Sequence, residues 1–148
     1  MAMQLPADFK EFLSLLGLHG VRYLLIGGYA VNYYGYTRAT GDIDVWIALD
    51  AANAERMVDV VREFGFDTPE LSPELFMQEG RIVRMGNIPL RIEILTVISG
   101  VTFEECYGER VVDTIDGVET SIINLSQLKR NKQASGRHKD LADLDHLR

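Results

Sequence analysis

Apolar residues recur at helical spacing in several stretches of the chain, and these stretches are predicted to form helices. They are residues 8–18, 29–34, 51–64, 101–107, 126–134 and 136–147. The stretch at 51–64 has the cleanest apolar face, and Gly65 is placed to end it. In the last stretch Leu141, Leu144 and Leu147 form one stripe. Asp140 and Asp143 are therefore expected to face away from the core.

Shorter apolar runs predict strands between these helices. The run at 21–26 is almost wholly apolar and is typical of a strand that is covered on both faces. Alternating residues predict a hairpin with arms 81–85 and 88–95 and Gly86-Asn87 as its turn. A second hairpin is expected at 110–123, around Asp116-Gly117. The order of elements predicts a single α/β domain over residues 1–148, with a mixed twisted sheet flanked by helices.

Size and composition narrow the functional classes. The chain has 148 residues, 47% of them hydrophobic and 25% charged, which is typical of a globular domain. A net charge of −7 disfavours non-specific binding of nucleic acid. A single cysteine, Cys106, excludes an internal disulfide and a multi-cysteine zinc site. No run is long enough to span a membrane and no signal peptide is seen, so the expected location is the cytoplasm, without a membrane partner.

Gly27 and Gly28 lie where the apolar run at 21–26 gives way to a helical pattern. Bare backbone N–H groups at the start of a helix can face an anion such as a phosphate. A tight turn is the simpler explanation when this feature is considered alone.

Asp42 and Asp44 begin another apolar run. Strand side chains alternate, so both carboxylates point to one face while Ile43 and Val45 point to the other, which is apolar enough to be buried. Carboxylates at this spacing lie roughly 6–7 Å apart, close enough to converge on one or two Mg²⁺ ions. A phosphate site beside a metal site indicates chemistry on a nucleoside triphosphate (NTP).

The order of residues in this region is Gly27-Gly28, Tyr29-Ala30-Val31, Gly35, Arg38, then Thr40-Gly41-Asp42-Ile43-Asp44. It resembles the signature of the nucleotidyltransferase superfamily with the DNA polymerase β-like fold. The resemblance is greatest to its minimal bacterial members, which include abortive-infection and toxin-type enzymes of toxin–antitoxin systems and enzymes that modify antibiotics. Many larger relatives have Gly-Ser where this chain has Gly-Gly, so one hydroxyl donor is missing from the expected phosphate site.

The resemblance implies a role for each residue that matches the pattern. Asp42, Asp44 and Glu93 would be catalytic and would hold two Mg²⁺ ions, with Glu93 on a later strand. From the residues alone, the competing explanation for Glu93 is an ion pair with Arg91 or another arginine on an exposed sheet face. The NTP would be bound by residues from three segments, namely Gly27, Gly28, Arg38, Lys129, Lys132, Arg137 and Lys139.

The expected reaction is transfer of a nucleoside monophosphate from an NTP such as ATP to a hydroxyl, with release of pyrophosphate. The acceptor is left open between an RNA end such as that of tRNA, a hydroxyl of a partner protein, and an antibiotic. The alternative is a non-catalytic binding module, or an antitoxin partner, that keeps the scaffold.

Overall fold

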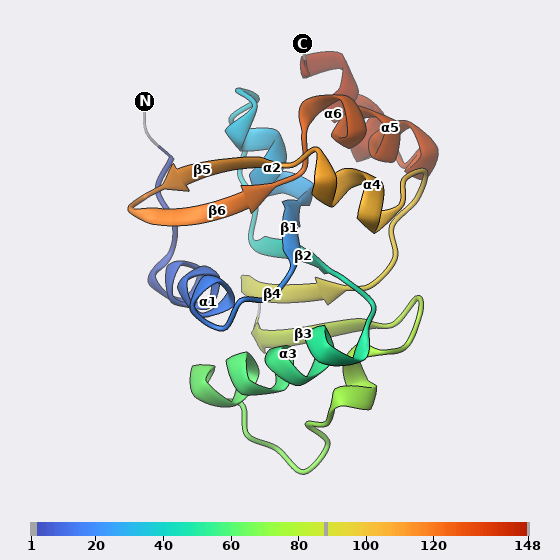
Figure 1. The fold of residues 1–148 in the computed structure, drawn as a ribbon. Coiled ribbons are helices and arrows are strands. Elements are labelled where there is room, and N and C mark those ends of the chain that lie inside the picture. The colour runs from blue at the N-terminus through green and yellow to red at the C-terminus, as the bar shows by residue number, and fades with distance from the viewer. Residues whose placement is uncertain (1–2, 88, 148) are drawn as a thin grey trace.

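The structure is a computed structural model that describes residues 3–87 and 89–147. Its centre is a six-stranded mixed sheet with the order β3-β4-β2-β1-β6-β5 (Figure 1). The strands are β1 (Tyr23–Ile26), β2 (Asp42–Ile47), β3 (Ile82–Asn87), β4 (Leu90–Leu95), β5 (Val111–Ile115) and β6 (Val118–Ile122). The mixed α/β architecture predicted from the sequence is confirmed.

The two central strands, β1 and β2, each have one parallel and one antiparallel neighbour. β1 is antiparallel to β2 and parallel to β6, while β2 is parallel to β4. All four residues of β1 are buried, as expected for a strand covered on both faces. The hairpins β3–β4 and β5–β6 form the two ends of the sheet.

Six α-helices and one short 3₁₀ helix are found in the described part of the chain. They are α1 (Ala7–Leu18), α2 (Gly27–Tyr33), α3 (Ala51–Phe64), η1 (Pro73–Phe76), α4 (Phe103–Gly108), α5 (Leu125–Ser135) and α6 (His138–His146). Helices α1 and α3 pack against each other, and α5 packs against α6. In Figure 1 the α5–α6 pair lies at the opposite end of the molecule from α3.

Helix α3 shows how the local sequence fixes its own limits. The Asp50 side chain accepts a hydrogen bond from the backbone N–H of Asn53 at 2.8 Å, which caps the first turn. Gly65 ends the helix with a left-handed φ of 116°. The helix predicted at 51–64 is confirmed at both ends.

The predicted turn of the first hairpin is wrong. Gly86 pairs with Arg91 and Asn87 pairs with Leu90, so both residues belong to β3 and the hairpin turns after Asn87. Gly86 has a φ of 89°, so its glycine character is required inside the strand rather than in the turn. Ile88, which was expected to begin the second arm, lies outside the described residues.

The predicted apolar stripe of the last helix is also wrong. Asp140 and Asp143 of α6 are buried, with 0% and 2% of their surface exposed, whereas Leu141 is 46% exposed. Leu147, just after the helix, is buried as expected. The aspartates face inward because lysine and arginine partners from other segments meet them there.

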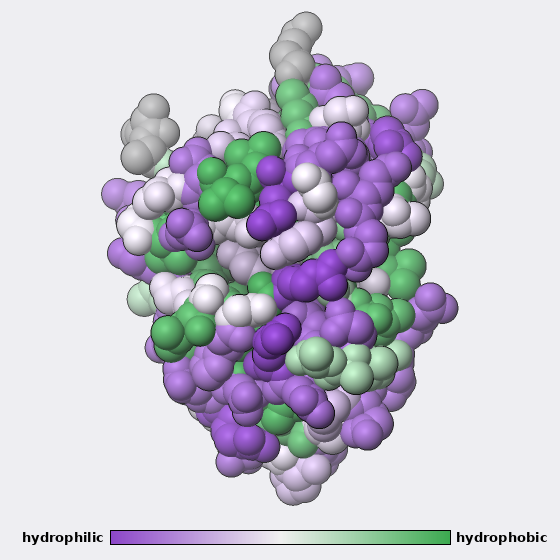
Figure 2. Space-filling view, viewed as in Figure 1, coloured by the Kyte–Doolittle hydropathy of each residue, from purple (hydrophilic) through white to green (hydrophobic). Residues whose placement is uncertain are grey.

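Within the described residues, no helix combines the length and the apolar character needed to cross a membrane. Figure 2 shows one face of the molecule, on which hydrophobic residues form separate patches among hydrophilic ones.

Candidate active site

Three acidic residues are brought to one region by the pairing of β2 with β4. In this parallel pair Asp44 lies opposite Glu93, and Asp42 lies opposite Arg91. The alternating residues Ile43 and Ile92 are buried with 0% and 2% exposure, so the other face of both strands belongs to the core. The three carboxylates that the resemblance assigned to one metal site therefore lie on neighbouring strands of the sheet.

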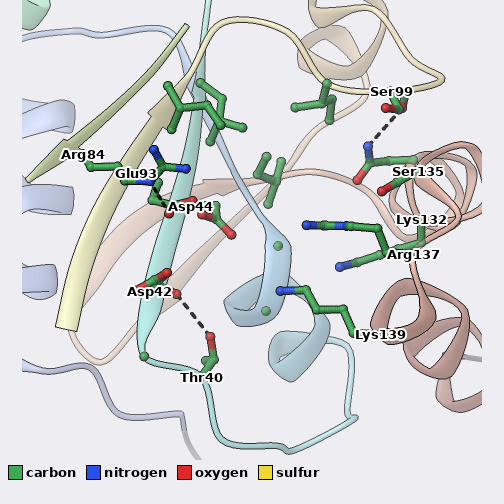
Figure 3. A pocket seen from close by; sticks show the side chains of 18 of the residues that line it. Thr40, Asp42, Asp44, Arg84, Glu93, Ser99, Lys132, Ser135, Arg137 and Lys139 are labelled. Carbon is green, nitrogen blue, oxygen red and sulfur yellow. Dashed lines mark hydrogen bonds and ion pairs between the residues drawn. The ribbon is translucent and has the colours of Figure 1, made fainter. Parts of the chain in front are cut away.

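The acidic residues open onto a cavity of about 580 Å³. Its lining comes from β2, β3, β4, the start of α2, the 38–41 loop, residues 97–99 and the C-terminal helices. Figure 3 shows Asp44 between Glu93 on one side and Arg137 and Lys139 on the other. Negative and positive side chains thus face each other across the cavity.

Asp44 is the least neutralised of the three carboxylates. Its Oδ1 atom is buried and has no hydrogen-bond partner among the described residues. Burial, a hydrogen bond with Glu93 and the negative charge of Glu93 raise the pKa of Asp44 from 3.8 to about 7, while Lys139 acts in the opposite direction. A positive ion at this point would stabilise the charged form of Asp44.

Arginines neutralise the other two carboxylates. Arg91 donates to both oxygens of Asp42, with Nη2–Oδ2 at 3.0 Å and Nε–Oδ1 at 3.3 Å. Arg84 of β3 donates from Nε to Glu93 Oε1 at 3.0 Å. The sequence-based alternative for Glu93, an ion pair with an arginine, is thus present, although the partner is Arg84 rather than Arg91.

The donor set fits a hard divalent cation. Carboxylate oxygens are the ligands that Mg²⁺ uses in proteins, and Asp44 offers a buried oxygen without a partner. In the described residues no three acidic, histidine or cysteine side chains already converge as metal ligands. Arg91 and Arg84 hold Asp42 and Glu93, so these two side chains would have to turn to join Asp44 around an ion.

Gly27 and Gly28 form the first turn of α2 instead of preceding the helix. Gly27 has a φ of 68°, and a Cβ atom there would overlap the carboxylate of Asp44. A Cβ atom on Gly28 would lie 2.7 Å from Thr40 Oγ1. Both glycines line the cavity, but their lack of side chains is required by the close packing of Asp44 and Thr40.

Arg38 is held at the cavity by the last helix. Its Nε and Nη2 atoms donate to the two oxygens of Asp143 at 2.9 and 3.0 Å. A bidentate pair of this kind fixes the plane of the guanidinium group. Arg38 belongs to the loop that leads into Asp42, so this contact joins that loop to α6.

The predicted basic residues near the C-terminus have three different surroundings. Lys139 is exposed at the cavity, and Arg137 lines it while donating to Asp140 at 2.7 Å. Lys132 lines the cavity but is 3% exposed, because its Nζ lies 3.2 Å from Asp140 and 3.1 Å from Asp143. Lys129 does not line the cavity, so its position does not support the predicted contact with the NTP.

Burial acts to raise the pKa of Asp140, but hydrogen bonds from Arg137, Ser135 and Lys132 outweigh it and hold this pKa below its usual range. Asp140 is therefore charged in the folded protein. With Lys132 it forms a buried ionic cluster that joins α5 to α6.

Sequence reasoning missed Arg84, Thr40 and Asp143 as members of this region. Arg84 was missed because the predicted turn at Gly86-Asn87 gives another register, whereas in the structure Arg84 pairs with Glu93 across β3 and β4. Asp143 had no local signal, since its partner Arg38 is 105 positions away.

Comparison with known proteins adds two findings. The model of the family described as "Nucleotidyl transferase of unknown function (DUF2204)" matches residues 6–148. The crystal structure of an antigenic nucleotidyltransferase-like protein from Paracoccidioides brasiliensis is similar, with a TM-score of 0.54 and 15% identity over 97% of this chain and 77% of that chain. At this identity the structural likeness bears on the fold alone. Among curated proteins, none matches the sequence.

Proposed function

Because this chain belongs to the family of nucleotidyl transferases of unknown function, and is thus a nucleotidyltransferase, we propose that it transfers a nucleoside monophosphate from an NTP to a hydroxyl group. The observation that carries the proposal is that Asp44 and Glu93 lie opposite each other on paired strands. Both line a cavity whose other side carries cationic side chains. Family membership supports nucleotidyl transfer as the class of reaction. The NTP, the metal ion and the acceptor are our proposal.

In the proposed reaction the acceptor oxygen attacks the α-phosphorus, and the bond from that phosphorus to the bridging oxygen of the β-phosphate breaks. Pyrophosphate leaves with the electron pair of that bond, and the acceptor hydroxyl loses its proton to Glu93. Asp42, Asp44 and Glu93 would hold Mg²⁺. Bound Mg²⁺ would supply positive charge where negative charge develops on the phosphoryl oxygens and the leaving group.

The chain's cationic residues would bind the triphosphate tail. Lys139 is exposed and is close enough to Asp44 for its charge to lower the pKa of that carboxyl, so it lies within reach of a phosphate held at the carboxylates. Arg38 presents a guanidinium group whose orientation is fixed by Asp143. Arg137 is exposed over 65% of its side chain and can turn toward a phosphate while Lys132 continues to neutralise Asp140.

The experiment is incubation of the protein with Mg²⁺ and ATP labelled in turn at the α- and γ-phosphate. Separate reactions would contain tRNA, a protein extract or an aminoglycoside as acceptor. Nucleotidyl transfer predicts that the α-label joins an acceptor while the γ-label leaves as pyrophosphate. Transfer of the γ-label would indicate a kinase, and free monophosphate without labelled acceptor would indicate a hydrolase. Either result would contradict the proposal.

One observation favours a second candidate, the non-catalytic module or antitoxin partner. Asp42 and Glu93 are both neutralised by arginines, as expected for a scaffold that no longer binds metal. Such a module would show no Mg²⁺-dependent binding of ATP. Titration of the protein with ATP in the presence and absence of Mg²⁺ separates the two candidates before any acceptor is known.

A further inference from the structure

Arg84 is the least firmly held of the three arginines that line the cavity among the described residues. Arg38 and Arg137 each donate through both Nε and Nη2 to one aspartate. The side chain of Arg84 is 51% exposed, and within the described part of the chain it donates from Nε alone, to Glu93. The two Nη atoms of Arg84 are therefore available to a ligand in the cavity.

Arg84 lies on the side of the site where the acceptor enters. It belongs to β3, an edge strand of the sheet, and pairs with Glu93 across β3 and β4. Figure 3 shows both residues on the side of Asp44 that faces away from Arg137 and Lys139. In the proposed reaction these two basic residues bind the triphosphate tail, and the acceptor gives its proton to Glu93. The acceptor therefore approaches over Arg84.

The pair between Arg84 and Glu93 can be broken at small cost. An ion pair with an exposed partner and one hydrogen bond contributes little to stability, because water competes for the charges. When Glu93 turns toward Asp44 to hold Mg²⁺, Arg84 loses the partner that it has among the described residues. Its guanidinium group then faces the incoming acceptor with an uncompensated positive charge.

We infer that Arg84 binds the acceptor, and that this acceptor is the hydroxyl end of a polynucleotide, an inference that rests on the proposed function. A guanidinium group binds phosphate oxygens well because two of its N–H groups can donate to them in parallel. The terminal sugar of a polynucleotide carries a phosphodiester as well as its free hydroxyl. The phosphodiester can lie at Arg84 while the hydroxyl lies at Glu93, on the next strand about 5 Å away.

The charges on this side of the site disfavour the other acceptors. Residues 81–95, which include the β3–β4 hairpin, contain three arginines and one glutamate, although the whole chain has a net charge of −7. An aminoglycoside carries several positive amino groups, which the arginines repel. A hydroxyl of a protein side chain brings no phosphate of its own. A local basic cluster on an acidic protein can bind nucleic acid, because the charges nearest the ligand dominate the field that it meets.

The test measures the binding of fluorescent single-stranded oligonucleotides, of RNA and of DNA in turn, by anisotropy. Titrations contain either Mg²⁺ or EDTA at equal ionic strength. With Mg²⁺, Arg84→Gln should bind roughly tenfold more weakly than the wild type, the effect of one charge-assisted contact. The salt dependence of log K should fall by about 0.7, the value for one phosphate on a single strand. With EDTA the loss should be much smaller, since Arg84 is then paired with Glu93.

The matched control is Arg56→Gln, which removes an exposed arginine of α3 that does not line the cavity and should keep wild-type binding. Arg84→Lys repeats the comparison with the charge kept and the paired N–H groups removed, and it should lose part of the affinity. ATP with Mg²⁺ should bind both Arg84 variants no more weakly than the wild type, because the triphosphate tail lies on the other side of Asp44.

An equal loss with Mg²⁺ and with EDTA would overturn the inference, because Arg84 would then act by its charge at a distance and not by changing partner. Transfer of the α-label to an aminoglycoside or a protein, with neither oligonucleotide labelled, would also overturn it. Failure of the proposed function has a different result. In that case the wild type binds no ATP with Mg²⁺ and labels no acceptor.

Discussion

Asp44 faces Glu93 across the parallel β2–β4 pair, and burial together with the neighbouring carboxylate of Glu93 raises the pKa of Asp44. Asp44 also has a buried oxygen that lacks a hydrogen-bond partner among the described residues. Two carboxylates held this close destabilise the folded protein unless a proton or a cation lies between them. This relationship decides how the protein should respond to substitution, pH and metal.

Asp44→Asn should abolish nucleotidyl transfer, with a loss of more than about 100-fold, because one charge is removed from the centre of the proposed metal site. The fold should remain, since an amide of the same size relieves the repulsion with Glu93. The measurements are the rate of α-label transfer and the Tm. Asp145→Asn, at an exposed position of α6, is the matched control. Wild-type activity in Asp44→Asn would show that the metal assignment is wrong.

The stability of the metal-free protein should decrease as the pH rises through about 7. The pKa of Asp44 is 3.8 in the unfolded chain and is raised to about 7 in the folded protein, chiefly by burial. Between these two pKa values the folded state holds a proton that the unfolded state releases. This proton stabilises the folded protein fully below the pKa of the unfolded chain, and the stabilisation is lost as the pH rises through the pKa of the folded protein.

Mg²⁺ should replace this proton, so it should raise the Tm more at about pH 8 than at about pH 6. Thermal unfolding with and without Mg²⁺ at both pH values measures the difference. In Asp44→Asn the difference should disappear. An equal Mg²⁺ effect at the two pH values in the wild type would mean that Asp44 is not a ligand.

Glu93→Gln should slightly raise the Tm of the metal-free protein and sharply reduce both transfer and the stabilisation by Mg²⁺ with ATP. The substitution loses the pair with Arg84, whose side chain is 51% exposed, so this loss is worth at most about 1 kcal/mol. Relief of the repulsion with Asp44 acts in the other direction. A less stable variant that keeps its response to Mg²⁺ would instead assign Glu93 a structural role.

Lys132→Met should lower the free energy of unfolding by about 3 kcal/mol, the usual cost of removing one partner from a buried ion pair. The lysine lies between Asp140 and Asp143, which would be left buried with less compensation. Denaturant unfolding measures the effect, and Lys129→Met on the same helix is the control. Similar stability of the two variants would show that the buried cluster contributes little.

Local patterns predicted the elements that depend on neighbouring residues. Asp50 and Gly65 bound α3 through contacts within a few positions, so its limits could be predicted from the sequence. Asp116-Gly117 likewise adopts positive φ values of 49° and 83° in the predicted turn of the second hairpin. Gly86-Asn87 carries a similar signal, but this pair is used inside β3.

Partners far apart in the sequence could not be predicted. The apolar stripe of Leu141 and Leu144 was a valid local signal, yet Arg38 and Lys132 draw Asp143 inward from distant segments. The position of Glu93 beside Asp44 depends on the strand order, which the residue pattern alone does not contain. Resemblance to a known family supplied that step.

Gly28 packs against Thr40, so the residues that one position tolerates depend on the residue at the other. A side chain at 28 and the present side chain at 40 compete for one volume, since a Cβ on Gly28 would lie 2.7 Å from Thr40 Oγ1. Thr40 therefore brings a hydroxyl to the side of α2 where a serine at 28 would have brought its own. A homologue with serine at 28 would need a smaller residue at 40 or a different path for that loop, so the two positions should vary together during evolution.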